Sequence, residues 1–551
     1  MRKQSKYLNF WTITTVSVLI LYVIFFLSPL TTLLKQSVMH PTTNKLTFQH
    51  FNKFFDRKYY FQTISNSFKV TSIATLLTLI IGVPLAYLTS VYKIKGKRFI
   101  NIVIIMSSMS APFIGAYSWI LLLGRNGLIT KFFKDTLSIT IPDIYGFNGI
   151  LLVFTLQLFP LVYLYIQGAL SIVDNTLFEA SESMGVTGIK RFYKVVLPLI
   201  RPTVFASGLM VFMRAFADFG TPMLIGEGYM TFSRLIFDSF VGEVGDDAGF
   251  AAAISVIAIL VTTGFFLIQR YLANKKQFSM SALHPIEPKQ LSKGKSILVH
   301  IFIYGFVGLA FMPQLYVFYT SFLKTSGLIF VKGYSLDSYR QAFSRMGSSI
   351  QNTFVIPGIA ILITIVMAVL IAYLIVRRRN VLTTTVDAVS MIPYVIPGSV
   401  IGIALVSRFA SGPIVLTGTM TIIIIAMVIR RLPYTIRSSA ATLSQISIST
   451  EEAAISLGAS EVKTFVKITV PMMASGIISG AILSWITMIT ELSTSILLYT
   501  SRTQTMTIAI YTQVIRGNYG IAAALATILS LLTLIALIIF MKLSKGKELT
   551  I

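Results

Sequence analysis

The stretch EASESMG at residues 179–185 returns as EAAISLG at residues 452–458, and these two stretches decide how the chain is organised. In both copies a glycine follows the glutamate by six residues, a phenylalanine follows that glycine by seven, and a proline follows it by thirteen. Glutamate, alanine and methionine favour a helix, glycine permits a turn that other residues resist, and proline suits the first turn of a new helix. Each stretch therefore predicts a short helix, a turn and a second helix.

The repetition extends outward from these stretches over most of the chain, which indicates two copies of one unit. The two stretches recur at an offset of 273 residues, whereas identities earlier in the units recur at an offset of 286. Because these offsets differ by 13, the first copy must hold a longer loop, which we place at 124–148. The further identities are Pro160 with Pro433 at an offset of 273, and Asn66 with Asn352 and Ala86-Tyr87-Leu88 with Ala372-Tyr373-Leu374 at an offset of 286.

The composition indicates that the units lie in a membrane. Of the 551 residues, 55% are hydrophobic and only 12% are charged, against about 25% charged in soluble proteins. So few charges cannot cover a water-facing surface, which excludes a soluble enzyme, a disordered chain and a soluble repeat array. The net charge of +26 comes from basic residues at the ends of apolar runs, which predicts contact with a lipid bilayer and no nucleic-acid partner. The absence of cysteine excludes disulfides and thiolate metal sites.

Twelve apolar stretches are long enough to span a bilayer, which takes about 20 residues. We therefore expect an all-α polytopic membrane protein with about 12 transmembrane helices in two parallel six-helix repeats. Two prolines predict a break in the ninth stretch. The stretches are 9–33, 67–91, 99–123, 149–170, 203–225, 249–269, 298–321, 353–376, 385–407 (with Pro393 and Pro397), 414–434, 473–498 and 520–541.

The distribution of basic residues orients the chain. With the N-terminus inside, the cytoplasmic segments hold 28 Lys and Arg and the exterior loops hold 15. The excess inside predicts that both termini and the polar segment 271–297 are cytoplasmic. Because the apolar run after the basic residues 2–6 is too long for a signal peptide, we interpret it as a retained anchor.

Two acids occupy equivalent positions within apolar stretches. Asp218 and Glu491 are 273 residues apart, and acids inside spans are costly and usually face a bundle interior or water. One interpretation is that both line a pathway for a cation. The other is that Asp218 forms an i,i+4 ion pair with Arg214, whereas Glu491 bonds to the hydroxyls of Thr487 or Thr490.

Other candidate sites are weak. Residues 294–296 (GKS) resemble the end of a phosphate-binding loop, but Lys289 stands where the first glycine is required and no strand precedes it. His40 and His50 share a segment with Asp56, yet scattered polar loop residues explain them better than metal binding. We find no catalytic set of residues, and we expect neither a metal nor a cofactor.

With their spacing and duplication, the two loops resemble the EAA loops in the membrane subunits of ABC importers of the type I fold. That resemblance covers roughly 62–270 and 348–541 and implies a helix that docks into a groove on a cytoplasmic ATPase. It also implies two copies of the ATPase, an exterior substrate-binding protein, and no enzymatic activity in this chain, because ATP hydrolysis belongs to the partner. Ser181 and Ser475 depart from the pattern without changing the Glu-to-Gly spacing. The matching residues are Glu179, Ala180, Gly185, Phe192, Pro198, Glu452, Ala453, Ala454, Gly458, Phe465 and Pro471.

The segments 217–222 and 491–498 are similar to segments of fused ferric-iron importer permeases, so iron import is the leading expectation. Phosphonate, thiamine, polyamine or another small solute remain alternatives for the same machinery. A third alternative, from a different class, is an ion-coupled secondary transporter with twelve spans. The Gly-x3-Asp-Arg pattern typical of the major facilitator family is absent from the loop 92–98, which disfavours it.

The resemblance gives the expected domains. A multi-pass protein of the cell (inner or plasma) membrane would comprise an N-terminal anchor helix and exterior loop (1–61), a first permease unit (62–270), a cytoplasmic linker (271–297), a seventh span with an exterior loop (298–347), a second permease unit (348–541) and a cytoplasmic tail (542–551).

Overall fold

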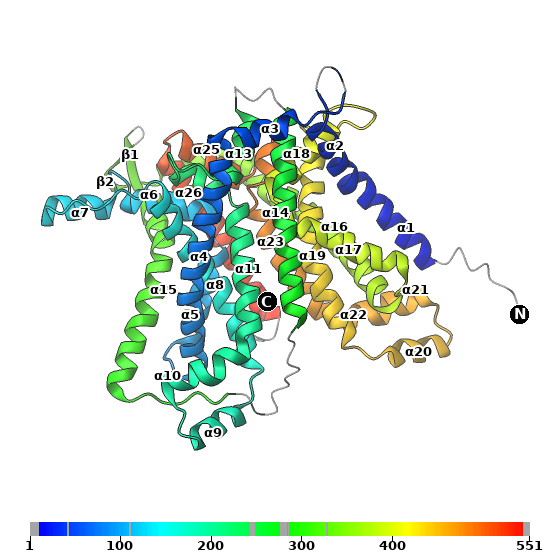
Figure 1. The fold of residues 1–551 in the computed structure, drawn as a ribbon, viewed down its shortest axis with the longest axis horizontal. Coiled ribbons are helices and arrows are strands. Elements are labelled where there is room, and N and C mark those ends of the chain that lie inside the picture. Colours follow the sequence, from blue (N-terminus) through cyan, green and yellow to red (C-terminus); the bar gives the residue numbers. More distant parts are fainter. Residues whose placement is uncertain are drawn as a thin grey trace, which may run out of the picture. The chain divides into compact units, whose positions relative to one another are not determined.

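The computed structural model describes residues 10–40, 43, 45–109, 112–242, 248–275, 284, 286–326 and 329–543. The basic residues 2–6 and the tail beyond residue 543 lie outside the described residues. Within the described ranges helices dominate, and Figure 1 labels them along the ribbon. Two short strands, β1 (Leu323–Ser326) and β2 (Ile329–Tyr334), form an antiparallel hairpin with Thr325 opposite Phe330.

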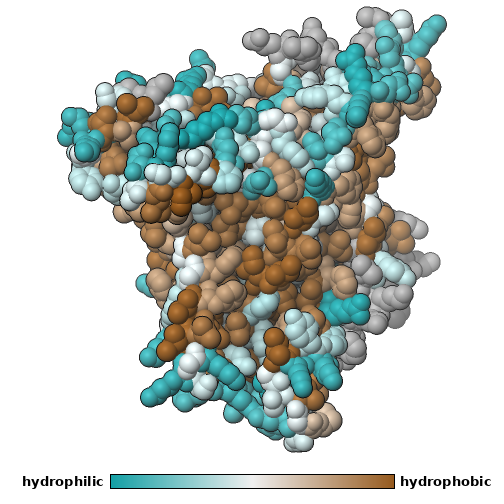
Figure 2. All heavy atoms as spheres, turned by 60° about the vertical axis from the view of Figure 1, so that its left-hand side comes forward, coloured by the Kyte–Doolittle hydropathy of each residue, from teal (hydrophilic) through white to brown (hydrophobic). Residues whose placement is uncertain are grey.

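Among the described residues, eight helical segments are long and apolar enough to cross a membrane. On the face drawn in Figure 2, hydrophobic residues form a band between hydrophilic zones, as a bilayer requires. The segments are Phe10–Ser37 (α1 Phe10–Tyr22, η1 Val23–Leu27 and α2 Ser28–Ser37), Lys58–Val91 (α4), Phe147–Ser171 (α8), Gly188–Ala217 (α10 Gly188–Arg191, η2 Phe192–Val196 and α11 Leu197–Ala217), Ala248–Ile268 in α14 (Ala248–Lys275), Lys293–Ser321 (α15), Asp337–Arg377 (α16) and Tyr519–Ile539 in α26 (Tyr519–Leu543).

Two bent pairs of helices raise the number of candidate spans to ten. The pair α17 (Val381–Val395) and α18 (Gly398–Phe409) bends by 110°. The break predicted in 385–407 is therefore present, and its cause is Pro397, which forces the extended backbone of Ile396 (φ −77°, ψ 133°). The second pair is Glu461–Met472 (α21 Glu461–Thr464, η3 Phe465–Thr469 and α22 Val470–Met472) with α23 (Ala474–Ile489), which bends by 70°.

Two further stretches among the twelve expected spans differ from a single apolar helix of the expected length. The stretch 99–123 is divided between α5 (Lys97–Met109) and α6 (Pro112–Leu123), on either side of residues 110–111, which the structure does not describe. The stretch 414–434 falls in α19 (Met420–Ser444), which is longer than expected and carries three arginines in its middle, at 430, 431 and 437.

The fifth span of each repeat is interrupted. The expected span 203–225 ends as a helix at Ala217, and the short helix α12 (Gly220–Ile225) follows. Similarly, 473–498 is helical only to Ile489 before α24 (Ser495–Leu498). The remaining short helices are α3 (Gln49–Asp56), α7 (Leu128–Leu137), α9 (Asn175–Ser183), α13 (Phe232–Val241), α20 (Ile448–Ser456) and α25 (Met506–Ile515).

The chain divides into two compact units that do not coincide with the two halves of the sequence. Among the residues that the structure describes, the first-repeat unit holds those in 55–235 and 260–320, and the second-repeat unit holds those in 10–54, 236–259 and 321–543. The N-terminal helices α1 and α2 thus belong with the second repeat, and α15, which opens the second half of the sequence, belongs with the first.

The exchanged helices pack against their unit through aromatic side chains. In the first-repeat unit, Phe306 of α15 lies 5.1 Å from Phe159 of α8, centroid to centroid. In the second-repeat unit, Trp11 of α1 lies 4.5 Å from Tyr373 of α16.

Close helix crossings form the core of each unit. In the first, α4 meets α8 at Gly82, where an added Cβ would lie 2.8 Å from the Val162 side chain. In the second, α23 meets α19 at Gly480, where an added Cβ would lie 2.7 Å from the Cα of Thr435. Small residues at such crossings let the backbones of membrane helices approach each other.

Candidate functional site

The first of the two repeated loops begins with a capped helix. The carboxylate of Asp174 accepts a hydrogen bond of 2.9 Å from the backbone N–H of Thr176, which caps α9 and lowers the pKa of Asp174. After α9 the chain turns at Gly185, whose φ is 72°, and continues through α10 and η2 into α11. In Figure 1, α9 and α10 lie at the lower end of the first-repeat unit.

The second loop repeats this geometry. Ser447 caps α20, and the chain then turns at Gly458 with a φ of 89°. The turn that the sequence predicts at Gly185 and Gly458 is therefore present in both copies. An added Cβ would have no neighbour within 4 Å at either glycine. The requirement for glycine is thus conformational, because other residues resist the left-handed region.

The two repeated phenylalanines attach the loops to the long helices. Phe192 and Phe465 are buried, and each begins a π-helical turn. The ring of Phe192 lies 4.9 Å from the ring of Tyr87 in α4, and the ring of Phe465 lies 4.7 Å from that of Tyr373 in α16. Both tyrosines belong to the repeated Ala-Tyr-Leu sequence, so each loop is fixed to the second span of its own repeat.

The outer faces of α9 and α20 are exposed. Glu179, Ala180, Glu452 and Ala453 are exposed, and Ala454 is half-buried. Pro198 and Pro471 lie in the first turns of α11 and α22, as their sequence positions predict.

Two equivalent apolar side chains stand out beside the turns. Met184 is 73% exposed and Leu457 is 90% exposed, and each directly precedes the turn glycine. Apolar side chains this exposed, at the same position of both loops, suit a surface that a partner protein covers.

The linker holds the first loop through polar contacts at the surface. The carboxylate of Glu182 pairs with the ammonium group of Lys289, which lowers the pKa of Glu182. The backbone N–H of Asn175 donates to the carbonyl of His284 at 2.9 Å. Arg191 adds a cation–π contact of 4.7 Å with Phe178.

The second loop is held by one buried ion pair and by a partly exposed cluster instead. Arg377 pairs with Glu451 at 2.8 Å, and both side chains are about nine-tenths buried. Arg378 pairs with Glu461 at 2.7 Å, and the indole N–H of Trp11 donates to the same carboxylate at 2.9 Å. Nothing in the sequence pattern indicates these five contact residues, because the partners lie far apart in the chain.

The surroundings of Glu491 overturn one expectation. Its carboxylate pairs with Arg430 at 2.5 Å and also with Arg431, both from α19. The expected partners, Thr487 and Thr490, donate their hydroxyls to backbone carbonyls of their own helix. The expected partners are close to Glu491 in the chain, whereas the arginines that bind it are about 60 residues away.

The cluster of Glu491, Arg430 and Arg431 also changes the count of basic residues on the two sides of the membrane. Arg430 and Arg431 were counted as cytoplasmic, yet their side chains are only 16% and 14% exposed and contact Glu491. Without them the bias is 26 basic residues against 15, which favours the same orientation.

Both acids cap the chain segment that follows a broken span. The carboxylate of Asp218 accepts from the backbone N–H of Thr221 at 2.9 Å, and that of Glu491 accepts from the backbone N–H of Thr494 at 2.9 Å. Asp218 follows the last residue of α11 and has an extended backbone (φ −76°, ψ 123°). The ion pair expected between Asp218 and Arg214 stays a prediction.

Metal-binding geometry is not found in the parts of the chain that the structure describes. Among these residues no three His, Asp or Glu side chains lie close enough together to hold a metal ion. His50 is buried at the side of Gly249, where an added Cβ would lie 2.3 Å from its Nε2 atom.

Comparison with known proteins agrees with two repeats. The family model described as "Binding-protein-dependent transport system inner membrane component" matches the chain twice, over residues 74–277 and 360–547. The chain belongs to this family. It is the membrane-spanning permease of an ABC importer, and the family decides against an ion-coupled secondary transporter.

The relatives of this permease include fused proteins of similar organisation. The ferric transport system permease protein FbpB of Actinobacillus pleuropneumoniae is 28% identical over 88% of this chain and 71% of its own length. The Fe(3+)-transport system permease protein FbpB 2 of Haemophilus influenzae is 26% identical over 85% of this chain and 87% of its own length. A spermidine/putrescine transport system permease protein, PotB of Haemophilus influenzae, is 26% identical over 42% of this chain and 80% of its own length.

Proposed function

We propose that this permease imports ferric iron. The observation that carries the proposal is the similarity to permeases named for ferric transport, which runs through both repeats rather than through one. The match to a polyamine permease covers less than half of the chain, so polyamines are the second choice of cargo.

We further propose that two copies of an ABC ATPase dock on α9 and α20 from the cytoplasm. The exposed faces around Met184 and Leu457 support this, because they offer the same apolar contact twice. The bias of basic residues supports a cytoplasmic position for both loops, the linker and both termini. A substrate-binding protein would deliver the cargo to the opposite side.

We propose that Asp218 and Glu491 lie beside the pathway. Two arginines flank Glu491. Arg430, Arg431 and Glu491 together carry one net positive charge, which would repel a bare trivalent cation. Iron would therefore pass this cluster as a complex in which anionic ligands offset its charge.

Reconstitution tests the proposal. The permease, its ATPase and its binding protein are placed in proteoliposomes, and ATP-dependent uptake is measured with radioactive ferric iron and, separately, with radioactive spermidine. We expect uptake of iron that requires both the binding protein and ATP. Uptake of spermidine without uptake of iron would contradict the assignment of cargo.

A further inference from the structure

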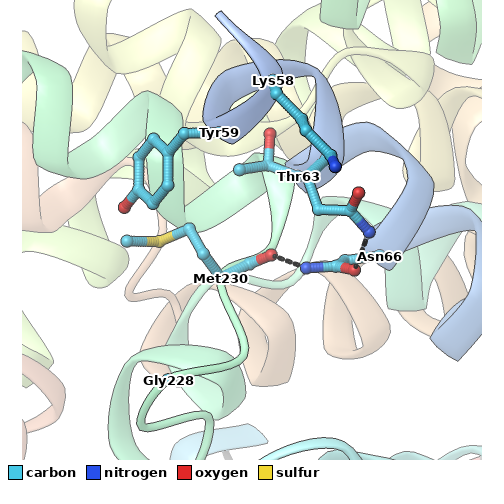
Figure 3. Close-up of a pocket in the computed structure, with 7 residues that line it drawn as sticks. Lys58, Tyr59, Thr63, Asn66, Gly228 and Met230 are labelled. Carbon is cyan, nitrogen blue, oxygen red and sulfur yellow. Dashed lines mark hydrogen bonds between the residues drawn. The ribbon is translucent and has the colours of Figure 1, made fainter.

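The repeated asparagine at residue 66 ties the start of α4 to a distant loop. Its side-chain N–H donates to the carbonyl of Met230 at 3.0 Å, as Figure 3 shows, and the Tyr229 hydroxyl donates to the carbonyl of Asn66 at 2.9 Å. The next residue, Ser67, accepts a hydrogen bond of 2.7 Å from the backbone N–H of Phe232. We call Asn66, Ser67 and residues 229–232 the first latch.

The second repeat contains the same arrangement. The side chain of Asn352 donates to the carbonyls of Arg502 and Gln504 at 2.9 and 3.0 Å. Thr353 accepts from the backbone N–H of Met506 at 2.7 Å. Asn352, Thr353 and residues 502–506 form the second latch. Two copies that keep the amide donor and the hydroxyl acceptor indicate that these bonds serve a purpose common to both repeats.

The latched segments lead back to the broken fifth spans. Ser233, next to Phe232, donates its hydroxyl to the carbonyl of Asp218 at 2.6 Å. In the second repeat, Thr507, next to Met506, donates its hydroxyl to the carbonyl of Ile489, the last residue of α23, at 2.8 Å. Each latch is thus one residue away from a bond to the end of an interrupted helix.

The helices that carry the latches reach the two repeated loops at their other ends. We call these loops, residues 174–192 and 447–465, the coupling loops. Tyr87, which contacts Phe192, follows Asn66 by 21 residues, and Tyr373, which contacts Phe465, follows Asn352 by 21 residues. At about 1.5 Å per residue, roughly 30 Å of helix separates the two contacts. In each repeat one stretch of helix, in α4 or in the part of α16 after its kink at Met346, therefore joins a coupling loop to a latch.

We propose that Asn66, Ser67, Asn352 and Thr353 are positioning residues that make α4 and α16 the connection between the coupling loops and the broken spans. When an ATPase moves its loop, the helix carries that movement to the latched segment and so to the end of the fifth span. This inference rests on the proposed function, and it adds the route by which ATP hydrolysis would open or close the pathway.

The surroundings of Asn66 make it a suitable residue for a test. It lies on the wall of an open pocket of about 320 Å³ (Figure 3) and is half-buried. Water can therefore replace its amide when the side chain is truncated. The pocket is lined by Lys58, Tyr59, Gln62, Thr63, Asn66, Gly228 and Met230.

The experiment uses the complete complex in proteoliposomes with the binding protein, radioactive ferric iron and ATP. For each variant we compare the iron imported per ATP hydrolysed and the stimulation of ATP hydrolysis by the binding protein. We expect N66A, and the double variant S67A/T353A, to import at least tenfold less iron per ATP, while basal ATP hydrolysis stays within twofold of wild type.

The chain supplies its own matched control, because the two repeats use different hydroxyl residues at the same place. The exchange variant S67T/T353S keeps both acceptors and should match the wild-type ratio within twofold. If uptake and ATP hydrolysis fall in proportion in the alanine variants, the residues are merely structural and the proposal is wrong. An unchanged ratio of imported iron to hydrolysed ATP in the alanine variants would also contradict the proposal.

Failure of the iron assignment gives a different result. In that case the wild-type protein imports no iron, yet the binding protein still stimulates ATP hydrolysis. The latch is then judged by that stimulation, which N66A should reduce at least fivefold and S67T/T353S should preserve. Stimulation of N66A equal to that of the wild type would contradict the latch.

Discussion

The Oε1 atom of Glu491 lies 2.5 Å from the Nη1 atom of Arg430, and the carboxylate is almost completely buried. Removal of one partner from a buried ion pair leaves the other charge without compensation, which costs about 3–5 kcal/mol. We therefore expect Glu491→Gln to lower the unfolding free energy of the purified permease by about this amount, measured by thermal unfolding in detergent. Asp218→Asn is the control, because an asparagine oxygen can still accept from Thr221. Equal losses in both variants would argue against the arginine cluster as the cause.

The turn glycines give a prediction about docking of the ATPase. A β-branched residue in the left-handed region costs at least about 1–2 kcal/mol, so Gly185→Val or Gly458→Val should weaken docking roughly 5- to 30-fold. The measurements are the affinity of the purified ATPase and its stimulated activity. Gly185→Asn is the matched control, since asparagine tolerates this backbone conformation and should retain most of the affinity. Normal docking by both valine variants would remove the turns from the mechanism.

The contact between the linker and the first loop should depend on pH. Lys289 lowers the pKa of Glu182, so the contact contributes fully above the ordinary glutamate pKa of about 4.3 and is lost as the pH falls through the lowered value. Spin labels on Glu179 and Lys293 would report a constant distance from pH 7 to pH 5 and a broader distribution below about pH 4. In Glu182→Gln the distribution should be broad at every pH. A distance in the wild type that does not change down to pH 3 would count against this ion pair.

The N-terminal helix should stabilise the second loop. Trp11 is 3% exposed, stacks on Tyr373 and donates to Glu461. Trp11→Ala should cost about 3–5 kcal/mol, whereas Trp11→Phe keeps the ring contact and should cost about 1 kcal/mol for the lost hydrogen bond. Hydrogen exchange of residues 448–465 should rise in the alanine variant, with residues 175–191 as the internal control. Equal increases in both loops would show general destabilisation instead.

The orientation can be tested directly, because the chain contains no cysteine. A cysteine at Gly228, where an added Cβ has no neighbour within 4 Å, should react with a membrane-impermeant maleimide in intact cells. A cysteine at His284 in the linker should react only after the cells are made permeable. Labelling of His284→Cys from outside would reverse the topology and the docking of the ATPase with it.

Local sequence patterns predicted the features that depend on neighbouring residues. The repeat, the long apolar helices, the turns at Gly185 and Gly458 and the break at Pro397 all follow from the preferences of residues close together in the chain. The broken spans are only partly of this kind: Gly220 and Pro222 stand directly after the break at Asp218, whereas residues 490–495 contain neither proline nor glycine that would reveal the break at Glu491.

Local sequence patterns could not predict contacts between segments that are distant in the chain. Arg430 and Glu491 are 61 residues apart, and Trp11 and Glu461 are 450 residues apart. A pattern of i,i+4 spacing cannot find such partners, so the arginines in α19 were taken for loop charges. A signal did exist for the latches, since Asn66 recurs as Asn352, but only the fold shows what these residues bind.

The exchange of helices between the two units has a consequence for biosynthesis. Trp11 emerges from the ribosome 362 residues before its ring partner Tyr373. At about 5–20 residues per second, the first helix waits roughly 20–70 s for the surface that it packs against. The first-repeat unit likewise stays unfinished until α15 has been translated. The first half therefore cannot complete its folding during its own synthesis, and a ribosome that stalls in the linker leaves α1 exposed to lipid and to the insertion machinery.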